Sequence, residues 1–312
     1  NINAYKLSFD ALFVKDQRKA AYFFDFQGDQ CFHTGFEICK YFNNTVFFVD
    51  MASSDLRPPG FCCGLKHEFQ PDIVYSIVFR YYPPEFYSLL ANVAYAGRNF
   101  QQYGVFSGFN MTLGPSARLS LSSDIYRNTW MPYNKTHFPV SYKGQCKIHA
   151  SSGKSELRFQ FFLKVNTNEI LTENRQIKDV NSGEQLGLNL RFRSLLDDKT
   201  LLTSGLCLRC SFFDDEDKST SRLIYQDVKR SFIRDLISIY FRLALYNTDS
   251  YSERIYLYEN DVLWAFSVPA FYYRGMRTAV LVSWKLTGIL AYGLNSVAIT
   301  FFNANHWGRG RI

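Results

Sequence analysis

Apolar and polar side chains alternate along much of the chain. In "ISIYFRLALY" (237–246), Ile239, Phe241 and Leu243 fall on one parity, whereas Tyr240 and Arg242 fall on the other. Successive side chains of a β-strand point to opposite faces, so this segment predicts a strand with one apolar and one mixed face. The same pattern is clear at 117–126, 142–150, 157–165, 185–193 and 201–213, and weaker at 4–14, 20–27, 33–41, 45–51, 72–82, 87–96, 103–113, 253–261, 276–286 and 289–302. The pattern predicts an all-β chain of roughly 14 strands.

Turn-forming and polar segments separate these predicted strands. Short turns are expected at 15–19, 113–117, 151–155, 196–200 and 247–250, and longer polar loops at 166–184 and 214–231. The segment "PPGFCCGLKH" (58–67) also reads as a loop. Short turns alternating with long loops are typical of an antiparallel up-and-down β-barrel. No linker interrupts the pattern, so we expect residues 1–312 to form one barrel domain.

The apolar face of these strands could meet either a protein core or lipid, and alternation alone does not separate the two. Several strands have the length of about 9–11 residues that a tilted strand needs to cross a bilayer. Aromatic residues make up 18% of the chain, with 30 Phe and 21 Tyr, yet mean hydropathy is only −0.18. No apolar run reaches the roughly 18 residues of a membrane-spanning helix. Together these features favour a transmembrane barrel over a soluble β-sandwich.

This orientation assigns a direction to individual side chains. In a membrane barrel the charged parity faces a polar lumen and the apolar parity faces lipid. The predicted lumen-facing residues are Arg118, Lys143, Lys147, Arg158, Lys164, Arg191, Arg193, Arg209 and Arg242. The predicted lipid-facing residues are Phe159, Phe161, Leu188, Leu190, Ile239, Phe241 and Leu243.

Aromatic residues gather beside prolines at three expected strand ends. These segments are "FRYYPPEFY" (79–87), "YRNTWMPY" (126–133) and "PAFYYRG" (269–275). Amphipathic rings favour the boundary between lipid and water, so such clusters are typical of the aromatic girdles of membrane barrels. Packed aromatics in ordinary loops are the alternative.

The sequence contains no recognisable metal or cofactor motif. Cys207 and Cys210 in "CLRC" would point to opposite faces of a strand, and the adjacent Cys62 and Cys63 have only His67 nearby. The acidic "DDEDK" (214–218) lacks the spacing and glycine of a calcium loop. We therefore expect no cofactor and no metal.

Two constellations could suggest catalysis. His149 precedes Ser151 and Ser152, but no G-x-S-x-G nucleophile signature is present. Glu259 and Asp261 share one parity, and they could serve either as paired catalytic carboxylates or as partners for inward-facing arginines. The second role needs no further residues, so we expect a structural charge network and no enzymatic activity.

Two segments resemble a known family. The run "YLYENDVLWAFSVPAFYYRGMRTAVLVSWKL" (256–286) is similar to the C-terminal barrel region of helix-hairpin-helix domain-containing outer-membrane proteins of Bacteroidota. The run "FRYYPPEFYSLLANVAYAG" (79–97), with "SARLSLSSDIYRNTWMPYN" (116–134) downstream, is a looser match. The resemblance covers about the last three-quarters of the chain and implies an outer-membrane barrel.

The chain also departs from that family. The helical hairpin that gives the family its name is absent, and so is a further closing strand that ends in an aromatic residue. The barrel is therefore either incomplete at its termini or a shortened relative. No residues here carry the DNA binding that the family name suggests.

These observations lead to one functional expectation and two alternatives. We expect an integral β-barrel of the bacterial outer membrane that is a non-catalytic subunit or scaffold of a protein assembly. Its partners would be the lipid bilayer and other outer-membrane or periplasmic proteins, with no nucleic acid. A net charge of +7 leaves open a porin-like, anion-preferring channel, and a soluble β-sandwich or lipocalin-like binder is the third possibility.

Overall fold

The computed structural model describes most of the chain in two compact units. The described residues are 3–18, 28–86, 102–130, 138, 140–171, 177–213, 217–232, 236–251, 253–260, 268–284 and 295–303. Unit 1 comprises Asn1–Leu113, Leu119–Gln145 and Lys164–Gly183, and unit 2 comprises Gly114–Arg118, Cys146–Leu163 and Glu184–Ile312. Strands β1 to β6 belong to unit 1 and β11 to β17 to unit 2, whereas β7 to β10 contribute residues to both.

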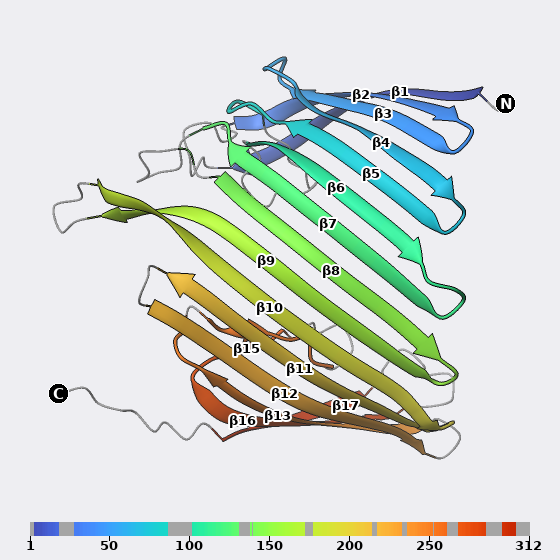
Figure 1. Cartoon of the computed structure of the whole chain (residues 1–312), viewed down its shortest axis with the longest axis vertical. Helices are drawn as coiled ribbons and strands as arrows, with labels where there is room; N and C mark the ends of the chain where they lie inside the picture. The colour runs from blue at the N-terminus through green and yellow to red at the C-terminus, as the bar shows by residue number, and fades with distance from the viewer. Residues whose placement is uncertain are drawn as a thin grey trace. The chain divides into compact units, whose positions relative to one another are not determined.

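Long antiparallel strands make up both units. The first nine are β1 (Asn3–Arg18), β2 (Gly28–Phe42), β3 (Thr45–Ser54), β4 (Gly60–Gln70), β5 (Ile73–Tyr81), β6 (Gln102–Thr112), β7 (Ala117–Asn128), β8 (Val140–Ser152) and β9 (Ser155–Leu171). The others are β10 (Ile177–Asp197), β11 (Thr200–Phe213), β12 (Asp217–Phe232), β13 (Ile237–Thr248), β14 (Ile255–Tyr256), β15 (Ala270–Phe271), β16 (Arg274–Trp284) and β17 (Asn295–Asn303). Figure 1 shows the strands side by side.

Each strand of the main sheet is hydrogen-bonded to its neighbours in sequence order, and β14 and β15 form a separate two-stranded sheet. The predicted all-β, antiparallel up-and-down arrangement is confirmed. Fifteen strands form the main sheet of the described residues, close to the predicted number. The described residues contain no helix of the length and apolarity that a membrane span would require.

Several predicted boundaries are wrong. Most of 58–67 and of 214–231, predicted as loops, lies in β4 and β12, and most of the predicted loop at 166–184 is strand. The predicted turn at 15–19 is strand as far as Arg18. The predicted strand at 253–261 is reduced to the two residues of β14. The predicted strands at 20–27 and 87–96 lie outside the described residues.

Connections differ in length, and in unit 1 short and longer ones alternate. In unit 1, two-residue turns follow β2 and β4, whereas 55–59 and 82–101 follow β3 and β5. Asn43 adopts the left-handed conformation in the first turn, with φ 39°. In unit 2, residues 198–199 join β10 to β11, and the much longer 249–273 joins β13 to β16. The turns predicted at 113–117, 151–155 and 196–200 lie where the sequence placed them.

Strand pairing fixes which side chains of unit 2 share a face, because directly opposite residues project to the same side. One row runs from Thr203 to Asp227 to Arg242 to Ala279 across β11, β12, β13 and β16. We call this side the polar face of unit 2. Its opposite, the apolar face, carries Leu188, Leu190, Phe192, Leu206, Leu208, Ile224, Phe241, Leu243, Leu245, Met276 and Val280.

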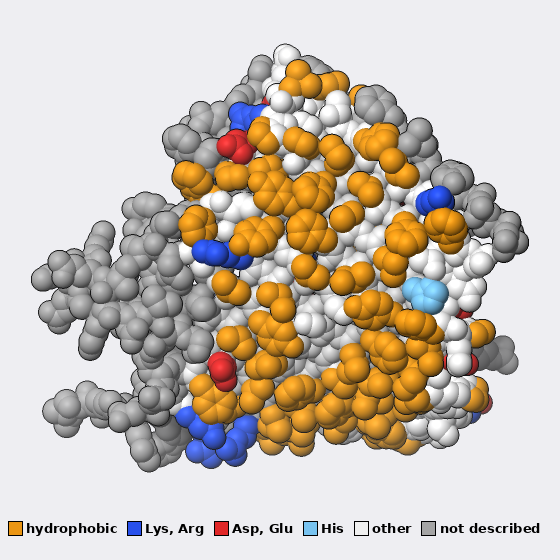
Figure 2. All heavy atoms as spheres, turned by 45° about the horizontal axis from the view of Figure 1, so that its top comes forward, with side chains coloured by type: hydrophobic (Ala, Val, Ile, Leu, Met, Phe, Trp, Pro, Cys, Tyr) orange, Lys and Arg blue, Asp and Glu red, His pale blue; other side chains and the backbone are white. Residues whose placement is uncertain are grey.

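The apolar face is the exposed one in unit 2. Phe241 is 40% exposed and Ile224 is 55% exposed, whereas Arg242, the residue after Phe241, is only 4% exposed. Figure 2 shows how densely hydrophobic side chains cover one surface of the molecule. A water-soluble sandwich would bury the apolar face and expose the charged one, so the burial pattern is inverted.

Unit 1 repeats this inversion. Arg80 in β5 is fully buried and forms an ion pair with Asp124 of β7 at 2.8 Å. The residue before it, Phe79, is 39% exposed and pairs with Val105, which is equally exposed. Both units therefore have the same two-sided construction.

Aromatic rings lie over glycines on neighbouring strands of the polar face. Gly205 of β11 is directly opposite Tyr225 of β12, and a Cβ atom added at Gly205 would lie 2.1 Å from the Tyr225 ring. Gly187 of β10 is covered in the same way by the ring of Phe162. Such a ring shields the exposed backbone of a strand glycine and helps to fix the strand register.

The glycine at 205 should therefore be required for this packing. Gly205→Ala should destabilise the protein by about 1–3 kcal/mol, because the methyl group overlaps the Tyr225 ring. Equilibrium unfolding in detergent micelles measures the loss. In a Tyr225→Leu background the same substitution should cost much less, and an equal cost in both backgrounds would contradict the ring-over-glycine account.

Candidate functional site

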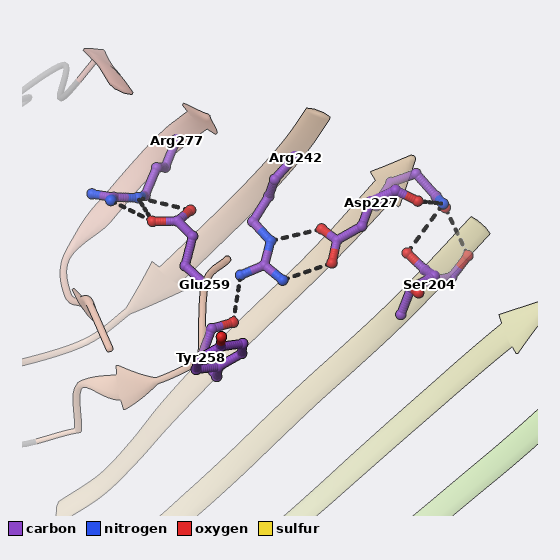
Figure 3. A network of polar contacts seen from close by, with 8 residues as sticks. Ser204, Asp227, Arg242, Tyr258, Glu259 and Arg277 are labelled. Atoms are coloured by element: carbon purple, nitrogen blue, oxygen red, sulfur yellow. Dashed lines mark hydrogen bonds and ion pairs between the residues drawn. The ribbon is translucent and has the colours of Figure 1, made fainter. Parts of the chain in front are cut away.

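The connection between β13 and β16 folds over the polar face of unit 2. We call residues 249–273 the covering segment, of which 249–251, 253–260 and 268–273 are described. Within it, Ile255 pairs with Phe271 and Tyr256 pairs with Ala270, forming β14 and β15. Figure 3 shows residues 258 and 259 of this segment reaching the side chains of the strands.

Apolar side chains hold the covering segment to the strands. Ile255 and Phe271 are each 1% exposed and pack into a cluster with Leu223, Tyr225 and Ala244 of β12 and β13. Burying two such side chains fully stabilises the arrangement by roughly 3–6 kcal/mol before the entropy of ordering the segment is subtracted. The small Ala244, which is completely buried, leaves room for them.

Arg242 lies at the centre of the buried charges. Its Nε donates to Asp227 Oδ1 and one terminal nitrogen donates to Asp227 Oδ2, both at 2.6 Å. The other terminal nitrogen donates to the backbone carbonyl of Tyr258 at 2.7 Å (Figure 3). The guanidinium also lies 4.9 Å from the ring centroid of Tyr225. Strand register and covering segment together satisfy this buried cation.

A second ion pair joins the covering segment to β16. Arg277 Nε and a terminal nitrogen donate to the carboxylate of Glu259, with the shorter contact at 2.5 Å. Both side chains are at most 10% exposed. The sequence pattern predicted that Glu259 would be the partner of an inward-facing arginine, and Arg277 is this partner. Asp261, its predicted companion, lies outside the described residues.

A third set of contacts fixes the start of the covering segment. Ser211 of β11 donates to Glu253 Oε2 at 2.8 Å, and Ser221 of β12 donates to the Glu253 carbonyl at 2.7 Å. Arg209 donates to the carbonyl of Arg254 at 3.0 Å. Nothing in the sequence around 209–221 signals these contacts, because each depends on strand register and on the fold of a distant segment.

The outer side of the covering segment carries tyrosines. Tyr251, Tyr256 and Tyr272 are 42–51% exposed. The Arg254 guanidinium lies 4.5 Å from the ring centroid of Tyr251 and donates to the hydroxyl of Tyr256. That hydrogen bond raises the pKa of Arg254 above its usual value, so the arginine stays charged. This surface presents one cation among exposed aromatic rings.

The predicted lumen-facing cations fall into three classes of exposure. Arg242 is buried and Arg209 is half-buried, and both lie on the polar face of unit 2. The others are exposed: Arg118, Lys143, Lys147, Arg158, Lys164, Arg191 and Arg193. Of these, Arg191 and Arg193 share the polar face with Arg209. The covering segment explains the difference, since it reaches Arg209 and Arg242.

The predicted lipid-facing residues of unit 2 are exposed or half-buried. Phe161, Ile239 and Phe241 are 38–40% exposed. Phe159, Leu188, Leu190 and Leu243 are half-buried. Leu188, Leu190, Ile239, Phe241 and Leu243 all belong to the apolar face.

Two histidine clusters bear on catalysis. His149 Nε2 contacts Glu156 at 2.8 Å, and Arg158 also bonds this carboxylate. The Ser151 hydroxyl instead donates to a backbone carbonyl. A cluster that the sequence reading missed contains Cys31, His33 and Ser54, with Cys31 Sγ 3.2 Å from the His33 ring and Ser54 Oγ 2.8 Å from it. Cys31 is 1% exposed, so a substrate would not reach its sulfur in this structure.

The cysteines that the sequence singled out lie within strands. Cys62 and Cys63, predicted in a loop, lie in β4, where they point to opposite faces. Cys207 and Cys210 also fall on opposite faces of β11. In the described part of the chain, no three histidine, cysteine or acidic side chains are close enough together to bind a metal ion.

Comparison with known proteins finds structural similarity only. No family model and no curated protein matches the chain. OmpT, an outer-membrane protein of Vibrio cholerae, is 9% identical over 89% of this chain and 94% of its own, with a TM-score of 0.42. An anion-selective porin from Comamonas acidovorans is 8% identical over 96% of this chain and 100% of its own, with a TM-score of 0.41. Similarity at this level is not evidence of a shared activity.

Removing Arg242 should leave the buried Asp227 carboxylate without its cation. Arg242→Met should destabilise the protein by about 3–5 kcal/mol, because Asp227 then remains buried without its cation. Adding Asp227→Leu should recover a substantial part of that loss. Denaturant unfolding in micelles measures both variants.

The matched control is Arg193→Met on the same face, because Arg193 is exposed and forms no ion pair with a described residue. It should change stability by less than about 0.5 kcal/mol. Equal losses at 193 and 242 would show that the buried pair is not the cause.

Proposed function

We propose that the protein is an integral β-barrel of the bacterial outer membrane, without enzymatic activity, that serves as a subunit or scaffold of an outer-membrane assembly. The observation that carries the membrane part is the inverted burial of neighbouring residues, with Phe241 40% exposed and Arg242 4% exposed. Apolar side chains on an exposed face are stable in hydrocarbon, and charges are tolerated only on the opposite side.

The strands suit this location. β13 has 12 residues and β16 has 11, enough for a tilted strand to cross a bilayer. In lipid every backbone polar group needs a partner, so an open sheet edge is not tolerated and the sheet would have to close. Closed barrels that span a membrane are typical of the bacterial outer membrane. A barrel like those of the Bacteroidota family that residues 256–286 resemble fits this proposal.

The covering segment favours a scaffold over an open channel. It occupies the polar face of β11 to β16 with paired charges and apolar contacts, rather than leaving that face to water. Its outer side offers exposed tyrosines and Arg254, residue types enriched at protein interfaces. A periplasmic or outer-membrane protein is the proposed partner.

An anion-preferring channel is the second candidate. Arg191 and Arg193 are exposed on the polar face, and neither forms an ion pair with a described residue. Uncompensated cations along a water-filled path would favour anions. This candidate requires that the covering segment leave a conducting path.

We propose that the protein is not an enzyme because its buried charged residues already bond one another. Arg242, Arg277, Asp227 and Glu259 satisfy one another or a backbone carbonyl, so they are engaged structurally. His149 bonds Glu156 and not the hydroxyl of Ser151, so its cluster has no nucleophile bonded to the histidine. In the other cluster the Cys31 sulfur is bonded to a histidine but is buried.

A charge placed on the apolar face tests the membrane location. Phe241→Arg should make folding into lipid vesicles less favourable by about 2–4 kcal/mol, because an arginine in hydrocarbon is costly. Phe241→Leu, which keeps the position apolar, is the matched control. If the protein folds without lipid or detergent and Phe241→Arg is neutral, the membrane proposal is wrong.

Electrical recording separates the scaffold from the channel. The wild-type protein in planar bilayers should show no steady conductance, whereas an anion channel would conduct and its conductance would depend on Arg191 and Arg193.

Purification from native membranes should also recover a stoichiometric protein partner. Replacing Tyr251 and Tyr256 with serine should weaken that association while leaving the fold intact, and steady anion conductance with no partner would overturn the scaffold role.

A further inference from the structure

We propose that the apolar face of unit 2 has a binding site for the phosphate headgroup and one acyl chain of an anionic membrane lipid. This inference rests on the proposed membrane location. The site consists of a polar row, formed by Arg222, Asn247 and Arg274, and the apolar hollow that it borders.

Strand pairing builds the polar row. Arg222 of β12 is directly opposite Asn247 of β13, and Asn247 is directly opposite Arg274 of β16. The three side chains therefore project to the same side, and the register places them on the apolar face. With strands about 4.8 Å apart, the two arginine Cα atoms are roughly 10 Å from each other, a span that two long side chains can close around one phosphate.

The row is exposed and its charge is uncompensated. Arg222, Asn247 and Arg274 are all exposed, and neither arginine forms an ion pair with any residue that the structure describes. Elsewhere in unit 2 the arginines at 242 and 277 are paired with carboxylates. Because these two cations have no carboxylate partner among the described residues and lie beside an apolar surface, one external anion can bind both.

A hollow of about 830 Å³ adjoins the row. Besides the row itself, its lining includes Leu206, Leu208, Ile224, Leu245 and Met276, which lie on the apolar face, and Leu223, Tyr246 and Gly275, which belong to the opposite parity. Figure 2 shows basic side chains beside a dense hydrophobic area. A cationic rim above an apolar hollow matches a phospholipid, whose phosphate adjoins its acyl chains, better than it matches a free phosphate ion.

Backbone geometry holds Arg274 in place. Tyr273, just before it, adopts the left-handed conformation with φ 58°, which is unusual for a residue with a side chain. The Tyr273 amide donates to Thr248 Oγ1 at 2.6 Å, and the Thr248 amide donates to the Tyr273 carbonyl at 2.8 Å. Thr248 follows Asn247, so the same contacts fix two members of the row.

Lipid binding to the purified, folded protein tests the site. Palmitoyl-oleoyl phosphatidylglycerol would be titrated in detergent and its retention measured by native mass spectrometry. Diacylglycerol, which lacks phosphate, and glycerol 3-phosphate, which lacks acyl chains, are the comparison ligands. We expect Arg222→Gln/Arg274→Gln to weaken phosphatidylglycerol binding at least tenfold, and diacylglycerol and glycerol phosphate to bind the wild type at least tenfold more weakly.

The matched control is Arg191→Gln/Arg193→Gln, which removes the same charge from the polar face and should leave lipid binding unchanged. Leu245→Trp, which fills the hollow, should weaken phosphatidylglycerol binding without changing that of glycerol phosphate. Equal weakening by both arginine pairs, or tight binding of glycerol phosphate alone, would overturn the lipid site.

Vesicle flotation of the same variants separates this inference from the proposed function. Wild-type protein that inserts in vesicles but binds lipid no better than Arg222→Gln/Arg274→Gln contradicts the lipid site alone. Protein that does not insert contradicts the membrane location itself. Far-UV circular dichroism confirms that each variant has folded, and a variant that unfolds is replaced by the single Arg222→Gln.

Discussion

The buried guanidinium of Arg242 joins β12, β13 and the covering segment of unit 2. A cation at this depth is tolerated only when its donors are satisfied. Its three partners come from two elements: Asp227 and the Tyr225 ring lie on β12, and the Tyr258 carbonyl belongs to the covering segment. A shift of β13 by one residue would turn Arg242 toward the apolar face and remove all three partners. The charge therefore specifies register as well as position.

Covering segment and strands depend on each other through the same contacts. The segment accepts hydrogen bonds from Arg209, Arg242 and Arg277, and the strands in turn bury its two apolar residues, Ile255 and Phe271. Without the segment, the arginines would need water or another anion on that face. Without Arg277, the buried Glu259 would lose its cation. Such mutual satisfaction is typical of a permanently seated segment rather than of a mobile gate, which needs a second stable arrangement.

Alternation made most strands predictable, and its exceptions are informative. β12 was read as a loop because Leu223 and Tyr225 lie on the same parity as Ser221 and Asp227, so the pattern looks mixed. Their apolar side chains face the covering segment, which turns part of the polar face into a small core. In β4, which the sequence predicts largely as a loop, Gly60, Gly64 and the adjacent Cys62 and Cys63 interrupt the alternation, and aromatic rings of Phe48, Tyr82 and Phe86 pack against those glycines. In both cases a distant segment supplies the reason, and one strand's sequence does not contain it.

The arginines of unit 2 also show why the net charge of the chain does not predict what its cations do. Arg242 and Arg222 both lie within strands, yet they differ in face and in partner. On the polar face an arginine can be neutralised by a carboxylate from the same chain, as Asp227 and Glu259 do. On the apolar face no described carboxylate meets Arg222 or Arg274, and their place at the border of the hydrophobic surface puts them where a phosphate would be found in a bilayer. A net charge of +7 is thus the sum of cations with different roles, and only strand register assigns each one to its role.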